Sequence, residues 1–163
     1  MEQLAVSLKP ATNSDKPVLT RLLYDYQREL LPYSGHTEEE ITSYKYLVNY
    51  FTDADRAAFL VMVRGEVGGF VFVNAHTLIE PDAHSIAEFY IIPAFRHSGV
   101  GEQVATMAFA KFPGRWEVAQ IGTNQPAVNF WRKVIGNVTN GQYKETILNT
   151  DTWHGPVQAF DVT

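Results

Sequence analysis

The stretch Ser85–Gly101 reads SIAEFYIIPAFRHSGVG, and it decides the fold. Its first half has the apolar character of a buried strand, and Pro93 ends that strand because proline cannot donate to a sheet ladder. A turn containing Arg96, Gly99 and Gly101 follows, and helical spacing begins there. A helix N-terminus leaves main-chain N–H groups unpaired and carries partial positive charge. The stretch therefore predicts a strand–turn–helix unit whose turn suits a bulky anion such as a pyrophosphate.

Taken alone, the turn leaves two interpretations open. Gly99 and Gly101 would let the main chain approach a phosphate closely, and Arg96 would either contact that phosphate or brace the loop. The plainer alternative is a tight connection that binds nothing. The turn lacks the GKS or GKT of a P-loop and the G-x-G-x-x-G of a dinucleotide fingerprint, so it belongs to neither class of phosphate loop.

Outward from this stretch, the apolar periodicity predicts helices and strands on both sides. Pro17 suits a first helical turn, and Thr37 followed by Glu40 is a capping-box pattern that opens a second helix. Asn124 can cap a later helix that Gly136 would stop. The expected elements are a strand over 5–8, a helix from 17 to the break at 31–35, a helix with inner face Ile41, Tyr44, Leu47, Val48 and Phe51, strands over 57–63, 67–78 and 85–92, a helix over 99–112, a strand over 116–121, a helix over 125–134, and strands over 143–148 and 157–162.

The element order is β-α-α-β-β-β-α-β-α-β-β. Helices inserted among hairpins favour an α/β fold of the α+β kind, with a mixed, mostly antiparallel sheet flanked by helices. No repeat or linker divides the chain, so residues 1–163 are expected to form a single domain.

The composition excludes several classes of protein. The chain has 163 residues, 45% of them hydrophobic, and no segment approaches the length of a membrane span. A net charge of −5 argues against general nucleic-acid binding, and the absence of cysteine excludes disulfides and thiolate sites. The start, Met1–Leu4, has no secretory pattern, and the absence of cysteine fits the cytoplasmic location that we expect. The five histidines show no metal-ligand spacing, and no metal is expected.

Two motifs make a resemblance specific. The run Arg96–Gly101, RHSGVG, fits the R/Q-x-x-G-x-G/A signature of the GNAT superfamily of N-acetyltransferases, and Ile91–Pro93 looks like the end of that family's fourth strand. Downstream, Asn124–Trp131, NQPAVNFW, resembles the family's N-x-x-A-x-x-F-Y segment. The element order also matches, so the resemblance covers nearly the whole chain. The stretches Phe112–Val118 and FWRKVIG, residues 130–136, also resemble a bacterial subgroup of uncharacterised proteins described as predicted acetyltransferases.

The resemblance implies a cofactor, acetyl-coenzyme A, and a set of residues that hold it. The strand around Phe89–Ile91 would splay from its parallel neighbour at a bulge and bind the pantetheine arm. The main-chain amides of His97–Glu102 would hold the pyrophosphate, with Arg96 beside them. Asn124 would contact the thiol end from a helix cap. The residues assigned to the cofactor are Phe89, Tyr90, Ile91, Arg96, His97, Ser98, Gly99, Val100, Gly101, Glu102, Asn124 and Trp131.

The chemistry implied is acyl transfer to a primary amine of a small molecule or peptide, by direct attack on the thioester. Glu88 is the candidate proton acceptor, and its alternative role is that of a solvated strand residue or ion-pair partner. Tyr90 shares its face and would either line the site or only pack. In the family, the first two helices border the acceptor, which makes Tyr26, Glu29 and Tyr33 candidate substrate contacts. A homodimer is a further expectation; nucleic-acid and membrane partners are not expected.

Trp131 departs from the family pattern, which has tyrosine at this position to protonate the departing thiolate. An indole N–H donates hydrogen bonds but is not a proton source. Three interpretations follow: the thiolate leaves unassisted, another hydroxyl such as that of Tyr90 or Tyr143 replaces it, or the domain does not catalyse. Three functions therefore stay open: an N-acetyltransferase, a non-catalytic acyl-coenzyme A-binding module, and an interaction domain without a cofactor.

Overall fold

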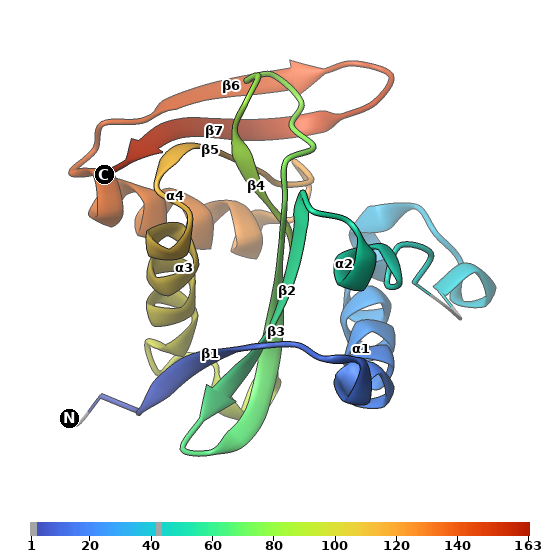
Figure 1. The fold of residues 1–163 in the computed structure, drawn as a ribbon. Helices are drawn as coiled ribbons and strands as arrows, with labels where there is room; N and C mark the ends of the chain where they lie inside the picture. Colours follow the sequence, from blue (N-terminus) through green and yellow to red (C-terminus); the bar gives the residue numbers. More distant parts are fainter. Residues whose placement is uncertain (1–2, 42–43) are drawn as a thin grey trace.

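The computed structural model describes residues 3–41 and 44–163. Residues 1 and 2 of the predicted start, and residues 42 and 43 of the second predicted helix, lie outside the described residues. The strands and the long helices follow one another in the predicted order (Figure 1). The strands are β1 (Val6–Pro10), β2 (Arg56–Val63), β3 (Glu66–Asn74), β4 (His84–Ile91), β5 (Gly114–Ala119), β6 (Lys144–Asn149) and β7 (His154–Val162), and the helices are α1 (Lys16–Ser34), α2 (Asn49–Thr52), α3 (Val100–Lys111) and α4 (Gln125–Thr139).

The strands form one seven-stranded sheet in the order β1-β2-β3-β4-β5-β7-β6. Every neighbouring pair is antiparallel except β4 and β5, which are parallel. The β4–β5 ladder is short: it contains only the pairs His84 with Trp116 and Ser85 with Glu117. Beyond Ser85, β4 and β5 no longer pair with each other, so the sheet opens between them.

Helices cover both faces of the sheet (Figure 1). One apolar core joins α3 and α4 to the face that carries Val61, Val71 and Phe89. A second core joins α1 and α2 to the opposite face, which carries Leu60, Phe70 and Tyr90. Since neighbouring residues of a strand point to opposite faces, β4 contributes to both cores. The predicted fold class, a mostly antiparallel sheet flanked by helices, is confirmed.

The first helix is longer than the sequence predicted. It continues through Pro32 to Ser34, and Gly35 caps it in the left-handed conformation with φ 76°. Proline conflicts with the carbonyl four residues earlier and is most tolerable near a helix end. Gly35, which adopts positive φ without a steric penalty, is therefore the stop, and Pro32 is not.

The second predicted helix is wrong as a single helix. Its described parts are a 3₁₀ turn over Glu38–Ile41 and the short α2, with hydrogen-bonded turns between Tyr44 and α2. The capping pattern is half present, because the Glu40 side chain accepts the main-chain N–H of Thr37. Val48, which was assigned to the inner face, is 59% exposed. The aromatic and β-branched residues of this segment favour a helix only weakly, and the exposure of Val48 removes the packing that would compensate.

Two other boundaries were predicted wrongly. Helix α4 runs through Gly136 and ends at Asn140, whose φ is 53°, and at Gly141, whose N–H bonds the Gly136 carbonyl at 2.8 Å. Strand β3 ends at Asn74, four residues before the predicted Leu78. The main-chain N–H of Leu78 donates instead to the buried Glu117 carboxylate at 2.6 Å, which turns the chain away from the sheet.

Candidate active site

Two cavities meet where β4 separates from β5. The larger cavity measures about 1110 Å³ and lies between the end of α1, β4, the β5–α4 loop and the β6–β7 hairpin. The smaller cavity measures about 800 Å³ and lies between α1, β4, the turn before α3, and α4. Both are lined by Tyr26, Leu30, Tyr33, Phe89, Asn124, Ala127 and Trp131. The opening of the sheet therefore joins one cavity to the other.

A β-bulge in β4 sets the direction of its side chains. The register with β3 shifts so that Phe72 opposes Glu88 while Val73 opposes Ile86, which leaves Ala87 as the extra residue. The bulge was expected near Phe89–Ile91, so its predicted position is wrong. A bulge re-aims the next side chain. Here Ala87 packs on the α1 face, and Glu88 points toward tyrosines on that same side.

The turn before α3 has the conformation of an anion site. His97 and Gly99 have φ values of 60° and 84°, and α3 begins at Val100. The N–H groups of residues 97–102 donate no hydrogen bond within residues 3–41 and 44–163, and the first helical bond from this region is made by Gln103 to the Gly99 carbonyl. These amides lie beside the smaller cavity, which His97, Gly99, Gly101 and Glu102 line. The arrangement can bind phosphate oxygens through main-chain donors.

The two glycines of this turn have different structural roles. At Gly99 a side chain would meet no atom within 4 Å, but its φ of 84° disfavours any residue with a Cβ. At Gly101 a Cβ would approach the ring of Phe130 on α4 to 3.1 Å. The sequence suggested that Gly101 lets a phosphate approach, whereas the structure explains this glycine by the contact of α3 with Phe130.

Arg96 braces the turn. Its guanidinium forms a two-point ion pair with Glu29 of α1 at 2.8 and 2.7 Å, and its Nε donates to the Ile91 carbonyl at 2.8 Å. It also lies over the Tyr90 ring, 5.5 Å from the centroid. Of the two roles that the sequence left open, these contacts favour bracing. Glu29 lines the smaller cavity and not the larger one, and Arg96 holds the pKa of its carboxyl below the usual value.

Tyr90 is nearly buried and lines the smaller cavity. Burial, followed by the nearby Glu29 carboxylate, raises the pKa of its hydroxyl to about 12. The nearby Tyr90 hydroxyl also lowers the pKa of the Glu29 carboxyl, after the larger effect of Arg96. Tyr143, the other hydroxyl considered at the sequence level, lines neither cavity.

Glu88 lies on the wall of the larger cavity, on the α1 side of the sheet. The Tyr44 hydroxyl donates to its Oε1 at 3.1 Å. Burial raises the pKa of the Glu88 carboxyl, while the nearby hydroxyls of Tyr26 and Tyr44 oppose the rise. Burial and the same carboxylate also raise the pKa of both tyrosine hydroxyls. Glu88 is therefore a carboxylate with raised basicity at the edge of a cleft.

Asn124 and Trp131 lie where the cavities join. The Asn124 Oδ1 caps α4 by accepting the Ala127 N–H at 3.3 Å, and its side-chain nitrogen donates to no residue that the structure describes. Trp131 is buried, with its ring 4.9 Å from that of Phe89 in an edge-to-face arrangement. The placement of Asn124 as a helix cap is as predicted, and both residues lie within reach of a ligand that spans the two cavities.

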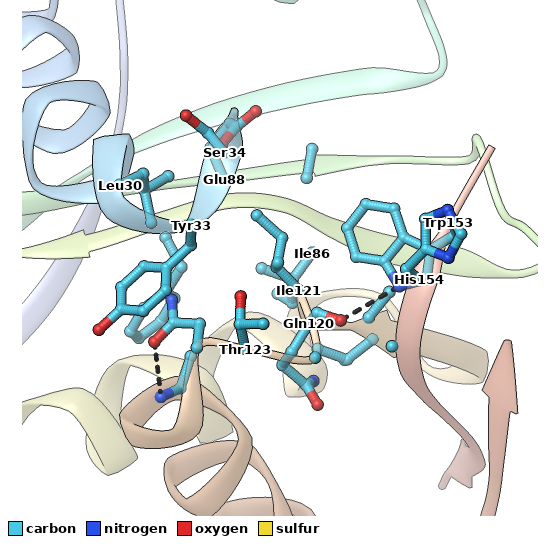
Figure 2. A pocket seen from close by; sticks show the side chains of 18 of the residues that line it. Leu30, Tyr33, Ser34, Ile86, Glu88, Gln120, Ile121, Thr123, Trp153 and His154 are labelled. Atoms are coloured by element: carbon cyan, nitrogen blue, oxygen red, sulfur yellow. Dashed lines mark hydrogen bonds between the residues drawn. The ribbon is translucent and has the colours of Figure 1, made fainter. Parts of the chain in front are cut away.

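Figure 2 shows how the larger cavity is lined from opposite sides. Leu30 and Tyr33 come from α1, and Trp153 and His154 come from the β6–β7 hairpin. The indole N–H of Trp153 donates to the Gln120 carbonyl at 3.1 Å, which fixes that ring to the end of β5. Of the predicted substrate contacts, Tyr26 and Tyr33 line this cavity.

Lys133 and Tyr44 are among the site residues that were not predicted from the sequence. Lys133, an exposed residue of α4, lines the smaller cavity and could meet an anion there. Its position three residues after Phe130, which lines the same cavity, places both on one face of α4 and was the available signal. Tyr44 was assigned to a helix face, and only the tertiary fold shows that it contacts Glu88, 44 residues further along the chain.

Within the residues that the structure describes, no group of three or more His, Asp or Glu side chains is arranged to hold a metal ion. Among these same residues, no helix has the length and apolar character needed to cross a membrane.

Comparison with known proteins gives a family match. The model of the "Acetyltransferase (GNAT) family" matches residues 20–136. Among the curated proteins, none matches significantly.

Several solved structures share the fold. An acetyltransferase from Thermus thermophilus is 19% identical, with coverage of 99% of this chain and 100% of that one and a TM-score of 0.70. The aminoglycoside acetyltransferase AAC(6')-Ib in complex with coenzyme A is 14% identical, with coverage of 96% and 95% and a TM-score of 0.67. Spermidine N-acetyltransferase from Vibrio cholerae, solved with coenzyme A and spermine, is 13% identical, with coverage of 94% and 92% and a TM-score of 0.62.

Proposed function

This chain belongs to the GNAT acetyltransferase family, and we propose that it transfers the acetyl group of acetyl-coenzyme A to a primary amine by direct attack on the thioester. The observation that carries the proposal is the meeting of the two cavities where β4 leaves β5. One cavity carries amides that have no partner among the described residues and suit a pyrophosphate, and the other carries a carboxylate of raised pKa. A thioester and an amine that entered from the two sides would meet beside Phe89.

The smaller cavity fits the cofactor. The amides of residues 97–102 would hold the pyrophosphate, and Lys133 would add a positive charge nearby. The side-chain nitrogen of Asn124 would meet the pantetheine arm, and Trp131 would exclude water from its reactive end. Acetyl-coenzyme A supplies an activated acyl group, so the protein needs to position the reactants and move one proton.

Glu88 would accept the proton of the attacking amine, directly or through one water. Its carboxyl faces the larger cavity. Burial raises its pKa toward neutral pH, and a general base is most effective when its pKa lies near the working pH. Tyr26 and Tyr44 would hold the carboxylate in place. The alternative role of Glu88, that of a surface ion-pair partner, is not supported, because its side-chain partners among the described residues are tyrosine hydroxyls.

No protein acid is required for the leaving group. Trp131 is not a proton source, Tyr143 lies outside both cavities, and burial beside the Glu29 carboxylate raises the pKa of the Tyr90 hydroxyl to about 12, which makes it a weak acid. A free thiol has a pKa of about 8.5, so a thiolate leaves readily without assistance. We therefore assign the thiolate an unassisted departure, which removes the main argument for a non-catalytic module.

The test combines binding and turnover. Calorimetry with coenzyme A should show binding, and release of free thiol in a panel of primary amines should show transfer. Glu88→Gln should lower kcat by roughly 10²-fold while the affinity for coenzyme A hardly changes. Glu66→Gln, at the exposed first residue of β3, is the matched control and should keep parental turnover.

Failure of coenzyme A binding, of amine turnover or of the Glu88→Gln effect would each contradict a different part of the proposal. Absence of coenzyme A binding would leave an interaction domain. Binding without turnover of any amine would leave a non-catalytic module of the same fold. Turnover that Glu88→Gln leaves unchanged would remove Glu88 from the proton transfer.

A further inference from the structure

The carboxylates that line the larger cavity have no lysine or arginine opposite them among the described lining residues. Among the described residues that line it, Glu88 and Asp151 are the only Asp, Glu, Lys or Arg side chains, so no cation of fixed charge faces the space. Its other ionisable groups are the tyrosine hydroxyls and the imidazoles of His36 and His154. The smaller cavity differs, because Arg96 and Lys133 line it. The acceptor side therefore favours positive charge and has no fixed partner for an anionic group.

Aromatic and aliphatic side chains make up much of the remaining wall. Tyr33 of α1 and Trp153 of the β6–β7 hairpin approach from opposite sides (Figure 2), and Phe89 and Trp131 close the inner end. Aromatic faces attract cations and bind flat apolar groups. Aliphatic groups at Leu30, Ile86, Ile121 and Ile147 extend the same surface.

We propose that the acceptor is a cationic primary amine with an apolar or aromatic body and without an anionic group. The inference rests on the proposed acetyl transfer and specifies the substrate of that same site. The ammonium group lies near Glu88 before it gives up its proton, and the body extends between Tyr33 and Trp153 toward Asp151. An α-amino acid is disfavoured, because its carboxylate enters the same space as Glu88 without a lysine or arginine to pair with it.

The cost of that misplaced carboxylate sets the expected selectivity. Removing an ionised carboxylate from water without a partner is unfavourable, and a neighbouring like charge adds to the penalty. The cavity is open to solvent, so the penalty is partial. We expect a difference of about 10²-fold in kcat/KM between an amine and the same amine that carries a carboxylate.

Matched pairs of acceptors provide the test. Phenethylamine, tyramine and histamine are compared with phenylalanine, tyrosine and histidine, and thiol release from acetyl-coenzyme A is followed in each case. Phenylalaninamide is the control for size, since it adds an uncharged group where phenylalanine carries its carboxylate. We expect turnover of the decarboxylated amines and of phenylalaninamide, with about 10²-fold lower kcat/KM for the amino acids.

A charge reversal at the mouth of the cavity gives a second measurement. Asp151→Lys supplies the missing cation, so the ratio of kcat/KM for phenethylamine to that for phenylalanine should fall by roughly 10-fold. Asp161→Lys reverses an exposed charge on β7 that lines neither cavity, and it should leave the ratio unchanged.

The outcomes separate this inference from the function on which it rests. If amines and amino acids react equally well, the charge selection is wrong and acetyl transfer stands. If phenylalaninamide is rejected as strongly as phenylalanine, size rather than charge excludes the amino acid, and the inference is again wrong. If coenzyme A binds but no amine of the set reacts, both the proposed function and this inference fail.

Discussion

At the scale of single residues, the proposed chemistry depends on how Glu88 is held. A carboxylate with a pKa raised by burial is a stronger base than a free glutamate, and it is useful only when its orientation is fixed. The Tyr44 hydroxyl donates to it at 3.1 Å, and the nearby Tyr26 hydroxyl also lowers its pKa. These contacts come from segments far apart in sequence, which explains why the sequence could identify Glu88 as a candidate but not its partners.

Tyr44→Phe should change the pH dependence of turnover. The hydrogen bond from Tyr44 stabilises the ionised carboxylate and lowers its pKa, so its loss should raise the pKa of Glu88 further. A base must be deprotonated to act, so the acidic limb of kcat/KM should move to higher pH. Tyr46→Phe, an exposed neighbour in the same aromatic cluster, should leave the limb in place. A limb that does not move in Tyr44→Phe would show that this hydroxyl does not tune the base.

The same pKa shift has a consequence for stability. A carboxyl whose pKa is higher in the folded than in the unfolded state binds its proton more tightly when folded. Stability is therefore gained as pH falls through the raised folded pKa and is reduced at neutral pH, where Glu88 is ionised. Glu88→Gln should thus be at least as stable at pH 7 as the parent, which is checked by thermal unfolding. A marked loss of stability would indicate that Glu88 has mainly a structural role.

At the scale of elements, local pattern predicted the long units well and their ends poorly. The strand–turn–helix unit around Arg96 and the cap at Asn124 follow from local chemistry, and the structure has both. The end of α1, the path of α4 through Gly136 and the break-up of the segment before β2 depend on positive-φ residues and tertiary contacts. The bulge at Ala87 left no sequence signal, because it arises from pairing with β3.

The packing of α3 against α4 makes Gly101 a stability site. A valine here would push against the Phe130 ring, 3.1 Å from the position of a Cβ, and should destabilise the fold by about 1–3 kcal/mol. Phe130→Leu should relieve part of that cost, so the two substitutions should be non-additive in denaturant unfolding. Gly99→Val is the comparison, since its cost comes from φ and should not depend on Phe130. Additive effects of Gly101→Val and Phe130→Leu would exclude the steric explanation.

The β3–β4 loop is anchored by a single buried carboxylate. Glu117 accepts the main-chain N–H groups of Leu78, Ile79 and Glu80 at 2.6, 2.9 and 2.9 Å, next to the point where β4 and β5 separate. Glu117→Leu removes the acceptors and leaves these donors to find water, which should cost roughly 2–4 kcal/mol. Glu117→Gln keeps one carbonyl oxygen and should lose less. Unfolding in urea measures both, and equal stability of the parent and Glu117→Leu would contradict the anchor.

At the scale of the whole molecule, the opening of the sheet is what joins the two cavities. Ladder pairing between β4 and β5 stops after Ser85, while β4 remains fixed to β3 along its other edge. One side of the gap then carries the free amides of the turn before α3, and the other carries Glu88. The family match and the shared fold agree with this architecture. The negative charge of the larger cavity comes from two particular residues of this chain, Glu88 and Asp151.

The central claim is that a thioester and an amine meet at this opening, and a crystal structure with coenzyme A tests it most directly. We expect the pyrophosphate on the amides of residues 97–102 and the sulfur beside Asn124 and Trp131, facing the larger cavity that contains Glu88. A cofactor bound elsewhere, or a sulfur that points away from the junction of the two cavities, would contradict it.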